Sequence, residues 1–255
     1  MRIFKFGGAS VKDADGVRNV AKVLQHEGTE NTLVIISAMG KMTNYFEEII
    51  DTYFYELEDL NLKLNKVELY HKNIISDLFQ KENEIYSEID VLFGELSWFL
   101  ARNTSQRYNY VYDQIICFGE LLSTKILSAY LNLLQIDNHW LDVRNYIKTD
   151  SNYRDAKVNW ILTQQIINDK LDLNKLNITQ GFLGGNDTEN TTSLGREGSD
   201  YTAGIFAYCL NAESVTIWKD VPGILNADPR VFKETTLIEQ ISYEETIEMA
   251  FYGAS

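Results

Sequence analysis

Short apolar runs alternate with helical repeats along most of the chain. The segments at 2–6 and 32–37, RIFKF and TLVIIS, are rich in the β-branched and aromatic residues that strands favour. Between them, apolar side chains recur at helical spacing from Val17 to Leu24. This order predicts a β-α-β unit with parallel strands and a right-handed crossover. Lys5 is unexpected within the first of these strands.

The segment at about 45–107 is predicted to be helical throughout. It is acidic and rich in tyrosine, and no glycine-rich stop interrupts its apolar repeat. We expect a helical insertion here, acting as a layer over the sheet or as a surface for a partner chain. A further helix is predicted over 108–134.

Strands and helices alternate again in the second half of the chain. Their expected order is strand 139–143, strand 176–185, helix 201–211, strand 214–218 and helix 242–253. The polar stretch 184–200 is predicted to be a glycine-containing loop, and both prolines lie in a second loop at 218–230. This alternation predicts an α/β fold, a three-layer αβα sandwich around a mostly parallel sheet.

Composition narrows the possible functions. The 255 residues suffice for one large α/β domain or two modest ones. A formal net charge of −14, from 23 basic and 37 acidic residues, argues against nucleic-acid binding. The two cysteines, Cys117 and Cys209, lie too far apart in sequence to suggest a disulfide framework. With no signal-peptide pattern and no apolar run long enough to cross a bilayer, we expect a cytoplasmic protein without a membrane partner.

The first candidate site is KFGGAS at 5–10, at the end of the first strand. Glycines here would let an anion approach the backbone N–H groups, and the Lys5 ammonium would lie against the same phosphate. The lysine precedes the glycines, so this is not a Walker-type loop. The alternative is a tight turn with no ligand.

The second candidate is SAMGKMTN at 37–44, directly after the second strand. Open α/β sheets bind ligands at the carboxyl ends of their strands, so Ser37 and Thr43 would hydrogen-bond a small polar substrate. The alternative is that Thr43 or Asn44 simply caps the following helix.

The third candidate is TTSLGREGSD at 191–200. Arg196 is suited to hold a carboxylate in a bidentate way, and Ser199 lies where a helix is predicted to begin. Asp200 at that position would hold a cationic group, namely an amine, a lysine or a metal ion. The alternative is that Ser199 or Asp200 is an ordinary N-cap.

Two further stretches carry polar groups in unusual places. The proline-stiffened loop WKDVPGILNADPR, at 218–230, offers candidates for nucleotide contact. Glu120 lies among apolar neighbours in FGELLS, where a carboxylate needs a partner. It is either an exposed helix position or the residue that receives a substrate ammonium.

Together these stretches resemble the aspartokinases, within the amino-acid kinase fold family, in order across the whole chain. The motifs that carry the resemblance are KFGGAS (5–10), SAMGKMTN (37–44), FGE (118–120), TTSLGREGSDYTA (191–203), WKDVPGILNADPR (218–230) and EMAFYGAS (248–255). The resemblance implies transfer of the ATP γ-phosphoryl group to the β-carboxylate of L-aspartate. The product, 4-phospho-L-aspartate, begins lysine, threonine and methionine biosynthesis.

The resemblance also implies roles for individual residues. Lys5 would neutralise the transferring phosphoryl group and Asp200 would organise the centre. Substrate binding is implied for Ser37, Thr43, Glu120, Arg196 and Ser199, with Arg196 on the α-carboxylate and Glu120 on the ammonium. ATP, accompanied by Mg²⁺, would contact Lys5, Gly7, Gly8, Ser10, Lys219, Asp220, Leu225 and Arg230. No residue is assigned as a metal ligand.

The domain organisation follows from the same resemblance. Residues 1–255 would form one amino-acid kinase domain, with an acceptor-binding lobe at about 1–185 and a nucleotide-binding lobe at about 186–255. The family's C-terminal regulatory ACT domains are absent from this sequence, and the full-length protein is expected to be a homo-oligomer. Two alternatives stay open: a related kinase with another carboxylate or small-molecule acceptor, and a truncated fragment that binds substrates with little turnover.

Overall fold

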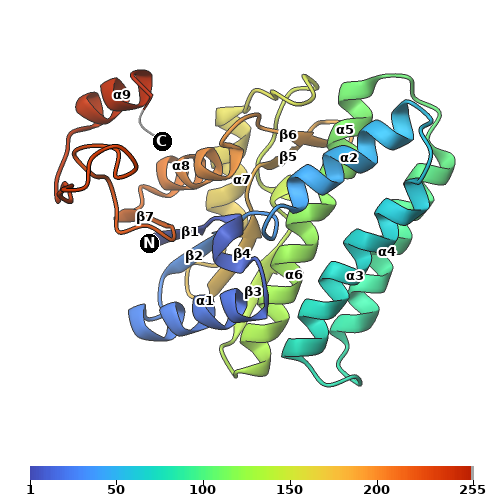
Figure 1. The fold of residues 1–255 in the computed structure, drawn as a ribbon, viewed down its shortest axis with the longest axis horizontal. Coiled ribbons are helices and arrows are strands. Elements are labelled where there is room, and N and C mark those ends of the chain that lie inside the picture. Colours follow the sequence, from blue (N-terminus) through green and yellow to red (C-terminus); the bar gives the residue numbers. More distant parts are fainter. Residues whose placement is uncertain (254–255) are drawn as a thin grey trace. The chain divides into compact units, whose positions relative to one another are not determined.

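Five parallel strands form the central sheet of the computed structural model, which describes residues 1–253 (Figure 1). Their spatial order is β3-β4-β2-β1-β7. The strands are β1 (Arg2–Phe6), β2 (Thr32–Ile36), β3 (Asn138–Leu141), β4 (Leu176–Gln180) and β7 (Ser214–Trp218). Every residue of β2 is buried, as expected for a central parallel strand with both faces covered.

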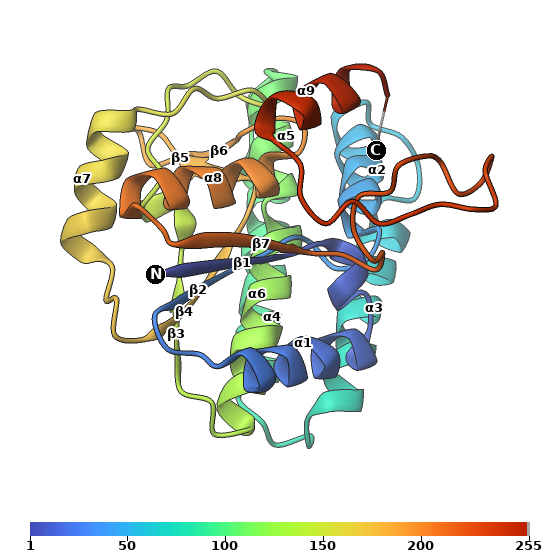
Figure 2. The same cartoon turned by 90° about the vertical axis from the view of Figure 1, so that its left-hand side faces the viewer.

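Two helical layers cover the sheet, as the right-handed crossover rule requires. The connections from β1 to β2 and from β2 to β3 move along the sheet towards β3, and they place α1 (Ala14–Glu27) and α6 (Phe118–Leu133) on one face. The connections from β3 to β4 and from β4 to β7 move in the opposite direction, and they place α7 (Trp160–Lys170) and α8 (Gly198–Leu210) on the other face. Figure 2 shows α8 and α1 on opposite sides of the strands. The predicted three-layer αβα sandwich around a mostly parallel sheet is confirmed.

The predicted helical insertion is also confirmed. It contains α2 (Met42–Phe54), α3 (Leu60–Leu78) and α4 (Ile85–Arg102). The single helix predicted over 108–134 is divided into α5 (Tyr108–Ile116) and α6. The break is slight, because Cys117 between them keeps a helical backbone, with φ −59° and ψ −24°.

Three parts of the second half differ from the prediction. The single strand expected over 176–185 is two strands, at 176–180 and 183–185, which belong to different sheets. Residues within the expected polar loop form β6 (Thr191–Ser193), which pairs antiparallel with β5 (Leu183–Gly185). The buried residues of β6 are threonine and serine, so no run of apolar residues indicated a strand in the sequence. Helix α7 was not predicted, because only Thr163 and Ile167 are buried and its apolar Ile161 faces solvent.

Short 3-10 helices follow two of the strands. The first, η1 (Gly8–Val11), comes directly after β1, and the second, η2 (Val143–Asn145), comes after β3. Both lie at the carboxyl ends of parallel strands, the edge at which open α/β sheets bind ligands.

The chain divides into two compact units, Met1–Trp218 and Lys219–Ser255. The first contains the whole sheet and its apolar core. The second contains the predicted loop and helix α9 (Tyr243–Phe251), which begins at a capping box made by Ser242 and Glu245. The last two residues of the EMAFYGAS motif lie outside the described residues. Within residues 1–253, no helix combines the length and apolarity needed to cross a membrane.

Candidate active site

Lys5 and Asp200 form an ion pair at the carboxyl end of β1. The Lys5 Nζ lies 2.6 Å from Asp200 Oδ1, and the lysine is only 6% exposed. A buried ammonium needs a partner, since its desolvation is otherwise unfavourable. Of the cations proposed for Asp200 from the sequence, the structure supplies the lysine. The same pair explains how β1 accommodates a charged residue.

The two residues open onto a cavity of about 410 Å³ in the first unit. All five residues predicted to bind the acceptor line this cavity: Ser37, Thr43, Glu120, Arg196 and Ser199. They come from the end of β2, from α2, from α6 and from the start of α8 with the residues just before it, and Lys5 adds the end of β1. Residues far apart in the sequence are therefore brought together at the carboxyl edge of the sheet, between helices that cover its two opposite faces.

Glu120 is buried, so the alternative of an exposed helix position is wrong. It is 3% exposed, and its Oε1 accepts a hydrogen bond of 3.2 Å from the Ala38 N–H. Its other oxygen has no hydrogen-bond partner among the described residues. Burial raises the pKa of this carboxyl from 4.5 to about 8, with the Ala38 hydrogen bond acting in the opposite direction. A cation in the cavity would satisfy the free oxygen and favour the ionised form.

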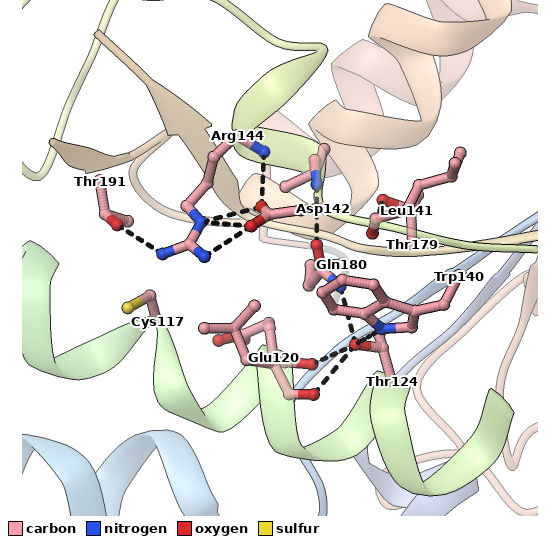
Figure 3. A network of polar contacts seen from close by, with 12 residues as sticks. Cys117, Glu120, Thr124, Trp140, Leu141, Asp142, Arg144, Thr179, Gln180 and Thr191 are labelled. Atoms are coloured by element: carbon pink, nitrogen blue, oxygen red, sulfur yellow. Dashed lines mark hydrogen bonds and ion pairs between the residues drawn. The ribbon is translucent and has the colours of Figure 1, made fainter. Parts of the chain in front are cut away.

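A buried polar network holds α6, and with it Glu120, against the sheet (Figure 3). The Thr124 Oγ1 donates to the Glu120 carbonyl at 2.9 Å and accepts from Gln180 Nε2 at 2.8 Å. The Trp140 Nε1 donates to the same hydroxyl at 3.0 Å. Gln180 in turn accepts from the Val143 N–H at 2.8 Å. The helix carrying the carboxylate is thereby tied to β3, β4 and η2.

The loop after β2 reaches the cavity through Ser37 and Thr43. Thr43 lies in the first turn of α2, and the residue before the helix, Lys41, makes no side-chain cap. Thr43 and Asn44 both lie within α2, so neither is the cap that the alternative proposed. A Cβ on Gly8 would come within 2.6 Å of the Ala38 carbonyl oxygen, so glycine is needed there for close packing against this loop. Gly7 is not required for close packing in this way. A Cβ added there would lie 3.8 Å from the Lys5 Nζ, at ordinary contact distance.

Helix α8 begins at Gly198, so Ser199 and Asp200 occupy its first turn as predicted. Neither is the N-cap, since that position belongs to Glu197 with a left-handed backbone, φ 55°. Arg196 precedes the helix, is exposed, and makes no ion pair within residues 1–253. Its guanidinium is free to bind an anion.

Sequence reasoning missed other residues that line the cavity. These are Glu47, Tyr112, Arg154, Phe182 and Ser193. Tyr112 donates a hydrogen bond of 2.8 Å to Glu47 Oε1, and the ring of Tyr112 lies under the Arg154 guanidinium. Each comes from a separate element. Ser193 belongs to the TTSLGREGSD candidate but was given no role, and Phe182 falls in a segment that was predicted only as a strand, whereas Glu47, Tyr112 and Arg154 stand in no motif that would mark them.

Apart from Lys5, which lines the cavity, the predicted nucleotide residues fall in two places. Gly7, Gly8 and Ser10 lie at the end of β1 and in η1, and none of them lines the cavity. Lys219, Asp220, Leu225 and Arg230 belong to the second unit. There the Arg230 side chain pairs with Asp228, with Nη2 2.7 Å from Oδ2, and Leu225 bridges to Leu237.

Comparison with known proteins identifies the class that this fold and cavity define. The family model "Amino acid kinase family" matches residues 1–255, and the chain belongs to that family. It is 32% identical to lysine-sensitive aspartokinase 3 of Escherichia coli over 256 residues, which cover 99% of this chain and 56% of that protein. It is 31% identical to the chloroplastic bifunctional aspartokinase/homoserine dehydrogenase 2 of Arabidopsis thaliana, covering 99% of this chain and 28% of that one.

Solved structures agree with the sequence comparison. The structure of E. coli aspartokinase III in complex with aspartate and ADP superposes with a TM-score of 0.88 at 33% identity. The match covers 98% of this chain and 56% of that one. The resemblance to the aspartokinases is thus confirmed. The chain spans little more than half the length of the E. coli enzyme and about a quarter of the plant one.

Proposed function

We propose that the chain transfers the γ-phosphoryl group of ATP to the β-carboxylate of L-aspartate, giving 4-phospho-L-aspartate. The observation that carries this proposal is the charge pattern of the cavity. A free guanidinium at Arg196 and an unpartnered carboxylate oxygen at Glu120 share it with Lys5. An α-amino acid presents the complementary carboxylate and ammonium. The aspartate and ADP bound to the E. coli relative support the same assignment.

The protein need not form a covalent bond to either substrate or act as a general base. A β-carboxylate oxygen, already ionised, forms a bond to the γ-phosphorus while the bond to the bridging oxygen of ADP breaks, and no proton is transferred. The barrier comes from bringing two anions together. Lys5 lowers it by neutralising the transferring group, and Asp200 holds the lysine in place through the 2.6 Å ion pair. Ser37 and Thr43 position the acceptor.

The nucleotide is assigned to residues around the end of β1 and to the second unit. In the first unit, Gly7, Gly8 and Ser10 are proposed for contacts to phosphate, and in the second unit Lys219, Asp220, Leu225 and Arg230 are proposed for nucleotide contact. The lobe boundary near residue 185 stays a prediction, as do the cytoplasmic location and the homo-oligomer.

Mg²⁺ fits the donor chemistry of this cavity. The ion prefers oxygen ligands and is often bound through one or two carboxylates with substrate phosphates. Asp200 offers a carboxylate that is 30% exposed. Among residues 1–253, no three His, Cys, Asp or Glu side chains gather as a metal site, so the other ligands would be phosphates and water. When bound with ATP, the ion would supply further charge neutralisation.

The test is release of ADP in a coupled assay with ATP, Mg²⁺ and a panel of acceptors that includes L-aspartate, L-glutamate and carbamate. We expect turnover with L-aspartate and its loss in Lys5→Met, with the fold intact by circular dichroism. Lys22→Met, which removes an exposed lysine on α1, is the matched control. Equal activity of Lys5→Met and the parent would refute the assignment.

Two other outcomes identify the alternatives. Turnover only with another acceptor would make this a related kinase. Binding of aspartate and ATP in isothermal titration, without ADP release, would make the chain a fragment that binds its substrates with little turnover.

A further inference from the structure

Arg154 lies on the same wall of the cavity as Arg196. The Ala156 N–H donates to the Ser193 carbonyl at 3.0 Å, so the segment after Arg154 runs beside β6. A Cβ on Gly195 would lie 3.4 Å from the Arg154 carbonyl oxygen. Gly195 immediately precedes Arg196, and both arginines line the cavity. The fold therefore places two guanidinium groups at one side of the acceptor position.

A buried carboxylate fixes the backbone of this wall. Asp113 is fully buried, and its Oδ2 accepts from the Arg154 N–H at 3.0 Å and from the Ser193 N–H at 2.9 Å. Its Oδ1 accepts from the Ser193 hydroxyl at 2.5 Å. One side chain from α5 thus ties the Arg154 loop to β6. The arrangement holds Arg154 and the Ser193 edge of the cavity as a unit.

The Arg154 guanidinium is held by stacking of its planar face on aromatic rings, and not by hydrogen bonds from its N–H groups. The guanidinium carbon lies 4.3 Å from the centre of the Tyr112 ring and 5.5 Å from that of Tyr108. Within residues 1–253 it makes no ion pair, although Glu47 lines the same cavity. A guanidinium stacked on a ring keeps its in-plane N–H donors available for a planar anion such as a carboxylate.

The backbone at Arg154 is unusual for a residue with a side chain. Its φ is 71°, in the left-handed region that favours glycine. Residues in this region are maintained when the surroundings over-determine them, and they gather at ligand sites. At Arg154 the hydrogen bond to Asp113 supplies that constraint. The constrained backbone places the cationic side chain over the Tyr112 ring in the cavity wall.

We propose that Arg154 is a specificity-determining residue that binds the non-reacting carboxylate of the acceptor together with Arg196. This inference rests on the proposed function, in which the acceptor is a dicarboxylate with one ammonium. Lys5 is paired with Asp200 at the end where the phosphoryl group is transferred. The carboxylate at the other end therefore needs its own cations, and the Arg154–Arg196 wall provides two.

The test compares two acceptors in Arg154→Met. One is L-aspartate, and the other is L-aspartate 1-amide, in which the non-reacting carboxylate is replaced by a neutral amide. A charge-assisted hydrogen bond contributes enough affinity that we expect the KM for L-aspartate to rise roughly tenfold, with the KM for ATP unchanged. The KM for the amide should change little, because the group that Arg154 binds is already missing. Arg154→Lys should show a smaller rise than Arg154→Met.

Arg107→Met is the matched control, since Arg107 also stacks on a tyrosine, 5.4 Å from the Tyr153 ring centre, without lining the cavity. It should leave both KM values unchanged. Arg154→Gly separates binding from folding, because glycine suits the left-handed backbone. It should keep the thermal midpoint of the parent and still show the raised KM.

Three results would overturn this inference. They are an unchanged KM for L-aspartate in Arg154→Met, an equal rise for L-aspartate and its amide, and an equal effect in Arg107→Met. The proposed function is judged separately, on the parent protein. A parent that neither phosphorylates nor binds L-aspartate in isothermal titration would overturn both. A parent that does so, with Arg154 variants that match it, would overturn only the role of Arg154.

Discussion

Glu120→Gln should change how the stability of the protein depends on pH. Burial raises the pKa of the Glu120 carboxyl from 4.5 to about 8. Between these values the unfolded chain has released the proton that the folded chain still binds. The contribution of this group to stability is therefore complete below about pH 4.5 and is lost progressively as the pH rises to about 8. Glutamine fills nearly the same space, can accept from the Ala38 N–H, and does not titrate.

The size of the effect follows from the two pKa values. Each pKa unit corresponds to about 1.4 kcal/mol, so between pH 4.5 and pH 8 the variant should gain roughly 4 to 5 kcal/mol relative to the parent. Urea unfolding followed by circular dichroism at intervals across this range measures the difference. Glu95→Gln, which changes an exposed carboxylate on α4, is the control and should follow the parent.

The acceptor supplies a second readout of the same group. An ammonium beside Glu120 favours its ionised form, so saturating L-aspartate should flatten the pH dependence of the parent towards that of Glu120→Gln. Parallel stability profiles for the parent and Glu120→Gln would refute the reasoning. A parent profile that L-aspartate leaves unchanged in shape would refute the contact between Glu120 and the ammonium.

Two further predictions concern the frame of the cavity. Gly8→Ala places a methyl group 2.6 Å from the Ala38 carbonyl oxygen and should lower the free energy of unfolding in urea by about 2 kcal/mol. Gly204→Ala on α8 is its control, because a Cβ there would have nothing within 4 Å, and it should raise the free energy of unfolding by about 0.5 to 1 kcal/mol. Asp113→Asn leaves a buried N–H or hydroxyl of the Arg154–Ser193 wall without its acceptor, so it should cost about 1 to 3 kcal/mol in urea unfolding and raise the KM for L-aspartate but not for ATP.

The sequence predicted those parts of the site that sit next to regular elements. Lys5, Ser37 and Asp200 each lie at the end of a strand or the start of a helix, where a hydrophobic pattern stops and a short polar motif follows. Because all strands of the sheet are parallel, their carboxyl ends meet at one edge, so the pattern alone implies that these side chains converge. The layer arrangement follows from the same pattern through the handedness of the crossovers.

The remaining wall of the cavity could not be predicted, for a physical reason. Arg154 owes its position to Asp113 on α5, which also binds Ser193 on β6, and neither contact leaves a local pattern. The strand that contains Ser193 buries hydroxyl side chains, so its polarity suggested a loop. Helix α7 carries apolar residues on its exposed side, which removes the helical period. Long-range pairing of polar groups decides these features.

The pairing of Lys5 with Asp200 connects the stability of β1 to the proposed chemistry. A lysine that is 6% exposed in a central parallel sheet would be strongly unfavourable alone, and the carboxylate that relieves this cost comes from α8. Since α8 also follows Arg196, the packing of this helix against the sheet brings the lysine, its counter-ion and the Arg196 guanidinium to the same cavity. A phosphoryl group entering beside Lys5 would share the ammonium with Asp200, so the cation is already oriented before the substrates arrive.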